Sequence, residues 1–291
     1  MYWRRWGYGR LVPAAVAPPD VLSLIADPRR WRLIAELSRS DRRVGELTEL
    51  LDLPQNLVSY HLGELRRAGV VVGRRSAADR RDVYYRADLH RCRDLLAEAG
   101  AGLHPGLRLV PSPPASGRPS GRTPRVLFLC TGNSARSQMA EALLVARSAR
   151  TIEARSAGSA PKPLHPRAVA TMAARRIDIG DASTKHFHRY VRGRFDRVIT
   201  LCDKVREVCP EFPAAASCVH WSIADPAAAD PPAAGDPDPF ALVADELERR
   251  IELLIAELVA AVPSPSPDPT DHTDHTDQTD RPTTRGSTDD R

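Results

Sequence analysis

A short apolar segment, Arg125–Leu129, runs directly into a polar loop that opens a helical pattern near Arg136. This order of strand, loop and helix constrains the fold more than any other feature of the chain. Three further apolar segments alternate with helical patterns, at Ile152–Arg155, Arg197–Leu201 and Cys218–Trp221. Strands that alternate with helices predict a parallel sheet that helices cover on both faces. We therefore expect an α/β domain over residues 124–262.

The loop Cys130–Ser137 has the composition of an oxyanion-binding site. It follows a strand, and open α/β sheets bind ligands at the carboxyl ends of their strands. The amides at a helix N-terminus favour a bound anion, and they also favour the thiolate at Cys130. Arg136 is spaced to fold back over the loop and to hold a tetrahedral oxyanion with paired donors. Gly132 permits an unusual backbone conformation, and Ser137 can donate its hydroxyl to the thiolate. The other residues of the expected oxyanion-binding loop are Thr131, Asn133, Ser134 and Ala135.

Two further cysteines indicate redox chemistry. Cys202 directly follows a predicted strand, so we expect it on the same rim of the sheet as Cys130. Six residues separate Cys202 from Cys209, and this loop can close into a disulfide if the segment rearranges. Two thiols that become a disulfide supply two electrons, which a reductase needs and a phosphatase does not. The alternative is two unconnected cysteines in a loop. We interpret Cys218 as a buried strand residue.

Residues 19–100 have the pattern of a winged helix-turn-helix domain. Helical patterns begin at Pro28 and cover Val44–Leu51 and Gln55–Ala68, and two short strands and a last helix over Asp88–Ala99 follow. This order is typical of a DNA-binding domain with a two-stranded wing. The formal net charge of +5 lies in the first 100 residues, as expected of a nucleic-acid-binding half. The alternatives are a solvated basic surface and a winged helix that contacts only protein.

The expected DNA contacts fall into two groups. Polar side chains of the recognition helix that lie outside its apolar stripe would reach base edges or phosphates: Gln55, Asn56, Ser59, Tyr60 and His61. Four arginines of the wing would contact backbone phosphates: Arg74, Arg75, Arg80 and Arg81.

A linker over residues 101–123, rich in proline, serine and glycine, separates the two halves. Such a composition does not hold a regular element, so we expect few contacts across it and separable domains. Residues 1–18 are expected to form a flexible leader. Residues 263–291, which have almost no large apolar side chain, are expected to form a disordered tail. No apolar run has the length of a membrane span or a signal peptide, and we expect a cytoplasmic protein.

The run Cys-Thr-Gly-Asn-Ser-Ala-Arg-Ser-Gln-Met-Ala-Glu, residues 130–141, resembles the signature of the low-molecular-weight protein tyrosine phosphatases. It is most similar to their thioredoxin-coupled arsenate reductase relatives. The resemblance extends over about residues 125–262 and implies a four-stranded parallel sheet flanked by helices. One departure is Ala135, where many relatives carry a second loop cysteine.

The same resemblance implies roles for residues farther along the chain. Cys202 and Cys209 resemble the redox pair of the thioredoxin-coupled reductases, and Cys130 would be the nucleophile. Asp225, in the run His220–Pro226, matches the general acid that protonates the leaving oxygen. Three alanines follow at 227–229, where phosphatases of this fold carry aromatic residues, which argues against an aryl phosphate substrate.

Residues 19–99 resemble the ArsR-type repressors, on the run Pro54–Val71 and on the wing. The resemblance implies operator DNA as a partner and a homodimer formed through the winged helix. Many arsenite-sensing relatives carry a Cys-x-Cys motif before the recognition helix, whereas Val44–Leu51 contains no cysteine. Either sensing uses Cys92 from both protomers with another ligand, or this domain does not bind arsenite.

The sequence thus predicts an arsenate reductase joined to a DNA-binding transcriptional regulator of arsenic resistance. The expected partners are arsenate, operator DNA and reduced thioredoxin as electron donor, with no bound cofactor, no metal and no membrane. Two alternatives remain open. One is a low-molecular-weight protein tyrosine phosphatase fused to a regulator. The other is a DNA-binding sensor whose phosphatase-like half only binds an oxyanion.

Overall fold

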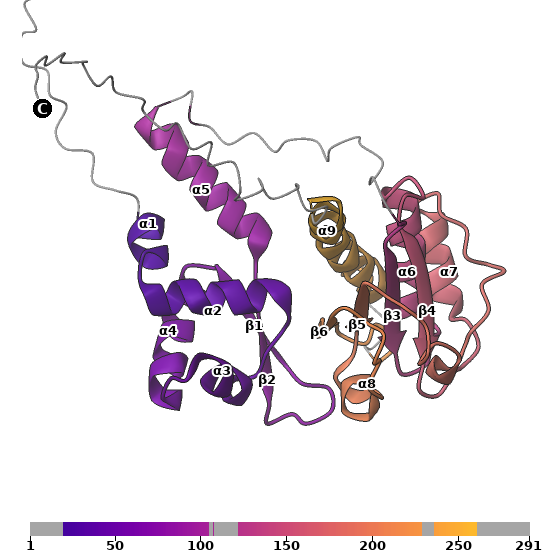
Figure 1. Cartoon of the computed structure of the whole chain (residues 1–291). Coiled ribbons are helices and arrows are strands. Elements are labelled where there is room, and N and C mark those ends of the chain that lie inside the picture. Colours follow the sequence, from indigo (N-terminus) through magenta and orange to yellow (C-terminus); the bar gives the residue numbers. More distant parts are fainter. Residues whose placement is uncertain (1–19, 105–106, 108–121, 229–235, 261–291) are drawn as a thin grey trace, which may run out of the picture.

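The computed structural model describes residues 20–104, 107, 122–228 and 236–260, which fold into two units (Figure 1). The predicted leader, most of the predicted linker and the predicted tail lie outside the described residues. Within the described residues, no helix is long and apolar enough to cross a membrane.

The first unit has the four helices and the two-stranded wing that the sequence predicts, and one further short helix before them. Its elements are α1 (Asp20–Ile25), α2 (Pro28–Arg39), α3 (Val44–Leu51), α4 (Gln55–Arg67), β1 (Val71–Arg75), β2 (Val83–Ala87) and α5 (Leu89–Leu103). α2 begins at Pro28, because the carboxylate of Asp27 accepts hydrogen bonds from the amides of Arg29 and Arg30. β1 and β2 pair antiparallel along their whole length. The core of this unit is formed by apolar side chains of its helices and wing, including Leu33, Leu37, Leu47, Leu51, Val58, Leu62, Leu65 and Val71.

The second unit is a four-stranded parallel sheet flanked by helices, which confirms the expected fold. Its elements are β3 (Arg125–Cys130), α6 (Arg136–Arg147), β4 (Glu153–Gly158), α7 (Pro166–Ala173), η2 (Phe187–Arg189), β5 (Arg197–Thr200), α8 (Asp203–Val208), β6 (Cys218–His220) and α9 (Pro239–Ala260). The strand order is β4-β3-β5-β6, and every pairing is parallel. β3 lies inside the sheet and is buried from Val126 to Cys130, which explains its continuous apolar sequence. α6 packs against β3 and β4, and α9 packs against α6 and α7.

Two features of the second unit differ from the prediction. The segment between Cys202 and Cys209 forms the short helix α8 and not a loop. Cys218 is exposed and not buried, because β6 is the edge strand of the sheet and Cys218 is its first residue.

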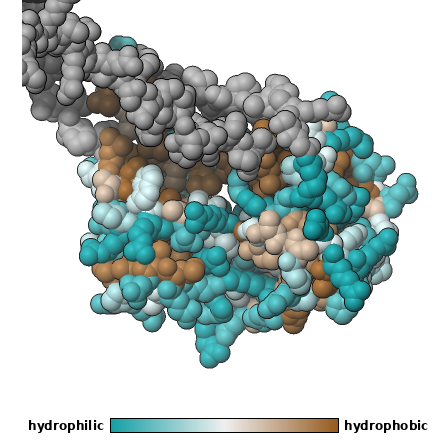
Figure 2. All heavy atoms as spheres, in the orientation of Figure 1, coloured by the Kyte–Doolittle hydropathy of each residue, from teal (hydrophilic) through white to brown (hydrophobic). Residues whose placement is uncertain are grey.

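The two units contact each other directly, so the expectation of few contacts between them is wrong. After α2, the amide of Asp41 donates to the carbonyl of His220 (2.8 Å) in the edge strand β6. Arg206 of α8 forms an ion pair with Glu46 of α3. The wing lies beside α8 (Figure 1), and hydrophilic side chains predominate on the face drawn in Figure 2. The composition of a linker does not indicate whether the two domains that it connects have complementary surfaces. In this chain the two surfaces form hydrogen bonds and an ion pair with each other.

Candidate active site

The loop between β3 and α6 turns several carbonyls toward a neighbouring segment. The carbonyl oxygens of Thr131, Gly132 and Ser134 accept hydrogen bonds from the amides of Ala160, Lys162 and His165, each at 2.9 Å. A trans peptide directs its N–H away from its carbonyl oxygen, and the described chain has no cis peptide bond. The amides of Gly132, Asn133 and Ala135 therefore face the opposite side. Backbone amides that face one side of a loop can bind an anion.

Asn133 fixes the shape of this loop from its centre. Its φ of 47° lies in the left-handed region, which asparagine adopts more readily than most residues. Its Oδ1 accepts a hydrogen bond from the amide of Lys185 (2.7 Å). Its Nδ2 donates to the hydroxyls of Ser137 and Ser156, both at 2.9 Å. The side chain is fully buried, so these bonds hold the loop without competition from water.

Cys130 lies at the end of β3, and its Sγ is 3.0 Å from the hydroxyl oxygen of Ser137. The residue is 2% exposed. Burial raises the pKa of the Cys130 thiol, and the charge of Arg136 and hydrogen bonds from Ser137 only partly offset this effect. Burial and the polar surroundings of this thiol therefore act on its pKa in opposite directions.

Arg136 and Asp225, two of the predicted site residues, contact each other. Nη1 of Arg136 donates to the carbonyl oxygen of Ile223 (3.1 Å), and Nη2 lies 3.0 Å from Oδ2 of Asp225. The guanidinium is buried, while the Asp225 side chain is 41% exposed. The arrangement places a fixed cation and a solvent-accessible carboxylate beside the loop that begins at Cys130.

Gly158, at the end of β4, is a site residue that the sequence analysis did not identify. A Cβ at this position would lie 2.5 Å from the carbonyl oxygen of Thr131 and 2.9 Å from the amide nitrogen of Asn133. The loop Cys130–Ser137, which is the predicted oxyanion loop, therefore rests directly on the backbone of β4, where only glycine leaves room. The pairing of β3 with β4 creates this contact, and it gives no local signal in the sequence.

All five cysteines are free thiols. The Sγ of Cys202 lies 3.3 Å from Oγ1 of Thr131, which places this thiol at the rim of the oxyanion loop. Cys209 lies at the other end of α8 and is half-buried. Burial raises the pKa of Cys209 to about 11, with a smaller contribution from Cys218. The two predicted redox cysteines thus cap opposite ends of one short helix.

A buried polar cluster beside Cys202 also escaped the sequence analysis. Oδ1 of Asp203 is 3.1 Å from Nε2 of His220 and 2.6 Å from the hydroxyl oxygen of Ser222, which donates to it. Burial would raise the pKa of Asp203, but the hydrogen bonds from His220, Ser222 and the Ala77 amide, with the charge of Arg74, hold it below its ordinary value. Burial lowers the pKa of His220. The cluster thus connects the first residue of α8 to the loop after β6.

The recognition helix α4 presents four of its five predicted DNA-binding side chains to solvent: Gln55, Asn56, Ser59 and Tyr60. The prediction that His61 contacts DNA is wrong, because this residue is 3% exposed. It follows Val58 by three positions and precedes Leu65 by four, so all three share the buried face of the helix. Both ring nitrogens are buried without a hydrogen-bond partner, and burial lowers the pKa of His61.

The four arginines of the wing differ in their exposure and in their contacts. Arg75, Arg80 and Arg81 are exposed, and Arg81 forms an ion pair with Asp79 (2.8 Å). Arg74 is turned toward the second unit, where its Nη2 lies 2.7 Å from Oδ2 of Asp203. In this arrangement Arg74 is not available to a DNA phosphate, which corrects that part of the prediction.

The lone cysteine of the first unit shows no features of a reactive thiol. Burial, with a smaller effect of Asp88, raises the pKa of Cys92 to about 11. Within the residues that the structure describes, no three His, Cys, Asp or Glu side chains converge on a point that could hold a metal ion.

Both units of the chain are similar to known proteins. Residues 125–264 match the family of low molecular weight phosphotyrosine protein phosphatases, and residues 27–72 match the arsR family of bacterial regulatory proteins. An arsenate reductase of Brevibacillus brevis is 36% identical over 127 residues, which are 44% of this chain and 90% of that protein. An arsenate reductase of Shouchella clausii is 38% identical over 127 residues, with 44% and 91% covered. A solved structure described as an arsenate reductase in the phosphate binding state is 30% identical, covers 46% of this chain and 98% of its own, and has a TM-score of 0.41.

The second unit places the chain in the low molecular weight phosphotyrosine protein phosphatase family. Within that family the chain belongs with the arsenate reductases, and an ArsR-family helix-turn-helix region precedes its reductase unit.

Proposed function

We propose that this chain reduces arsenate to arsenite through a relay of three thiols and that its winged helix binds operator DNA. The position of Cys202 carries the reductase proposal, because its Sγ lies 3.3 Å from Thr131 at the rim of the oxyanion loop. A phosphatase needs no second thiol at this point. A reductase needs one, because two thiols that become a disulfide supply the two electrons that arsenic gains.

In the first step, Cys130 attacks arsenate held by Arg136 and the loop amides. An As–S bond forms and an As–O bond breaks, while arsenic remains As(V). Asp225 protonates the leaving oxygen, which departs as water. The proton balance closes, because the Cys130 thiol loses one proton and the leaving oxygen gains one.

In the second step, Cys202 attacks the Sγ of Cys130. The electron pair of the S–As bond stays on arsenic, which leaves as arsenite, As(III). Cys209 then attacks the Sγ of Cys202, which forms the Cys202–Cys209 disulfide and restores the Cys130 thiol. Reduced thioredoxin, the proposed electron donor, reduces this disulfide and completes the cycle.

The last disulfide requires α8 to rearrange. Cys202 and Cys209 flank a six-residue helix, and a helical rise of about 1.5 Å per residue separates their Cα atoms by roughly 10 Å. A disulfide joins Cα atoms no more than about 7 Å apart. We therefore propose that α8 unwinds when Cys209 attacks and that this movement presents the disulfide to thioredoxin.

The first unit supports a regulatory role. The exposed polar side chains of α4 can reach base edges, and the exposed wing arginines Arg75, Arg80 and Arg81 can contact phosphates. We propose that the chain binds a symmetric operator as a homodimer through this unit.

Arsenate-dependent oxidation of NADPH, coupled through thioredoxin and thioredoxin reductase, tests the relay in a cysteine series. Cys209→Ser should release one arsenite per chain and trap the Cys130–Cys202 disulfide, which mass spectrometry of tryptic peptides identifies. Cys202→Ser should stall at the arsenic adduct, and Cys130→Ser should be inactive. Cys92→Ser, in the other unit, is the matched control and should turn over normally.

Two results would contradict this scheme. Full turnover of Cys209→Ser with thioredoxin would mean that an external thiol resolves the adduct. A wild-type chain that hydrolyses an aryl phosphate but oxidises no NADPH with arsenate would favour the phosphatase alternative.

A further inference from the structure

Two side chains of the winged-helix unit hold Ser222, a residue in the loop that follows β6. The carboxylate of Asp41 accepts a hydrogen bond from the Ser222 amide (2.7 Å). Arg74 donates from Nε to the Ser222 carbonyl oxygen (2.8 Å) and from Nη2 to the Ser222 hydroxyl. Ser222 is 2% exposed, so water does not compete for these bonds. The amide, the carbonyl and the hydroxyl of this one residue are all engaged from the other unit.

The residues after Ser222 hold the oxyanion-binding arginine. The carbonyl oxygen of Ile223 accepts a hydrogen bond from Nη1 of Arg136, and Asp225 forms the ion pair with Nη2. The carbonyl that Arg74 holds and the carbonyl that Arg136 contacts are consecutive along the backbone. A shift of Ser222 is therefore transmitted to Ile223 and from there to the guanidinium of Arg136.

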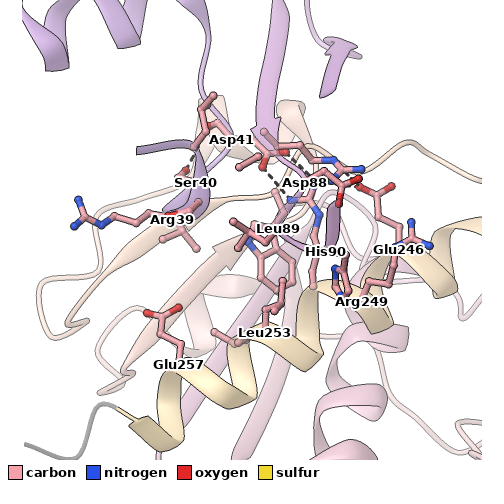
Figure 3. A pocket seen from close by; sticks show the side chains of 18 of the residues that line it. Arg39, Ser40, Asp41, Asp88, Leu89, His90, Glu246, Arg249, Leu253 and Glu257 are labelled. Atoms are coloured by element: carbon pink, nitrogen blue, oxygen red, sulfur yellow. Dashed lines mark hydrogen bonds and ion pairs between the residues drawn. The ribbon is translucent and has the colours of Figure 1, made fainter. Parts of the chain in front are cut away.

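Asp41 is itself firmly placed at the junction. Arg250 of α9 donates to both of its carboxylate oxygens (2.9 and 3.1 Å), and Asp41 is 3% exposed. The hydroxyl of the preceding residue, Ser40, accepts a hydrogen bond from the amide of His220 (2.9 Å). Figure 3 shows the pocket at this junction, which Ser40 and Asp41 line from the winged-helix side and Glu246 lines from α9.

Arg74 is also held by a residue of α8, the helix between the two redox cysteines. Its Nη2 pairs with the buried carboxylate of Asp203, the first residue of α8. The same carboxylate oxygen accepts a hydrogen bond from the amide of Ala77 (2.6 Å). Two residues of the wing, Arg74 and Ala77, thus bind the first residue of the segment that separates the two redox cysteines.

We propose that Asp41 and Arg74 are positioning residues for the reductase, which hold the loop after β6 so that Arg136 and Asp225 lie where an oxyanion needs them. The reductase site is then complete only when the winged-helix unit is docked. This inference rests on the proposed arsenate reduction. Asp41 and Arg74 contact Ser222 and not the reacting atoms, so both act on the site through Ser222.

The size of the effect follows from the geometry. A misplacement of about 1 Å in groups that orient a substrate costs on the order of 100-fold in rate. Loss of Arg74 leaves the bond from Asp41 to Ser222 in place, so the loop loses only part of its support. We therefore expect about a tenfold loss in kcat/KM when the Arg74 donors are removed.

The test compares Arg74→Met, Arg74→Lys and Arg67→Ala in the full chain. Methionine keeps an apolar stem of similar length and removes the donors. Lysine restores one donor group. Arg67 is an exposed arginine of α4 that pairs with Glu64 of the same helix, so its replacement serves as the matched control.

Three quantities are measured for each chain. They are kcat and KM for arsenate, the dissociation constant of inorganic phosphate from calorimetry, and the urea midpoint of unfolding. Phosphate is an unreactive oxyanion of the same shape as arsenate. Arg74→Met should lower kcat/KM and weaken phosphate binding by about tenfold, Arg74→Lys should recover part of both, and Arg67→Ala should match the wild type.

Equal kcat/KM and equal phosphate affinity in Arg74→Met and Arg67→Ala would overturn the proposal. If Arg74→Met does not fold, Arg74→Gln replaces it with the same expectation and the same refuting result. A wild-type chain that binds phosphate but reduces no arsenate would refute the proposed function, while the comparison of phosphate affinities still decides whether Arg74 positions the site.

Discussion

Replacement of Gly158 by alanine would push the oxyanion loop away from β4. The new Cβ would lie 2.5 Å from the carbonyl oxygen of Thr131, 2.9 Å from the amide nitrogen of Asn133 and 3.0 Å from the carbonyl oxygen of Cys130. All three are backbone atoms, so no side-chain rotation relieves these contacts. Ordinary van der Waals contact begins at 3.4 Å, so the loop has to move by about 0.9 Å at Thr131.

This displacement should affect both stability and turnover. Overpacking of a close-packed site costs about 1–3 kcal/mol in the free energy of unfolding. The loop amides also move relative to Arg136, and a misplacement of this size costs on the order of 100-fold in rate. Urea unfolding measures the first effect, and arsenate-dependent NADPH oxidation with thioredoxin and its reductase measures the second.

Gly45→Ala provides the matched control for this experiment. Gly45 lies in α3, and a Cβ there would meet no atom within 4 Å. Alanine should raise the free energy of unfolding by about 0.5–1 kcal/mol, because it restricts the unfolded chain, and turnover should stay unchanged. A Gly158→Ala chain with wild-type turnover would refute the argument that a side chain at position 158 displaces the oxyanion loop.

Two further predictions concern the wing and the buried carboxylate. Replacement of both Arg75 and Arg80 by alanine should reduce the slope of log DNA affinity against log salt by about 1.8, since each phosphate contact accounts for about 0.9. Arg74→Met should leave this slope unchanged, and an unaltered slope in the double variant would remove the wing from the DNA interface. Burial raises the pKa of Asp203, but hydrogen bonds from His220 and Ser222 outweigh this effect and hold the pKa below its ordinary value. Its contribution to the free energy of unfolding is therefore complete above the ordinary pKa of 3.8 and is lost as the pH falls below it. Urea unfolding from about pH 6 to about pH 3 should show the beginning of this loss in the wild type and less of it in Asp203→Asn, whereas equal acid sensitivity would contradict the assignment.

The sequence was sufficient for the parts of the site that follow one another along the chain. Cys130 and Arg136 flank a loop between a buried strand and a helix, and local patterns fix that order. Cys202 was placed near the loop by topology alone, because parallel strands end at the same rim of the sheet. The regular spacing of apolar residues likewise located α4 and its exposed face, although His61 shows that a polar residue can occupy the buried stripe.

The remaining contacts of the site depend on segments that are far apart in the sequence. Gly158 supports the oxyanion loop because β4 pairs with β3, and Asn133 is held by Ser156 from that same strand. Asp41 and Arg74 reach Ser222 across the junction of the two units. No local pattern encodes such contacts, because periodicity and spacing describe a residue's own helix or strand. Which surfaces meet is decided by complementary shape, charge and hydrogen bonding, and those exist only once both units have folded.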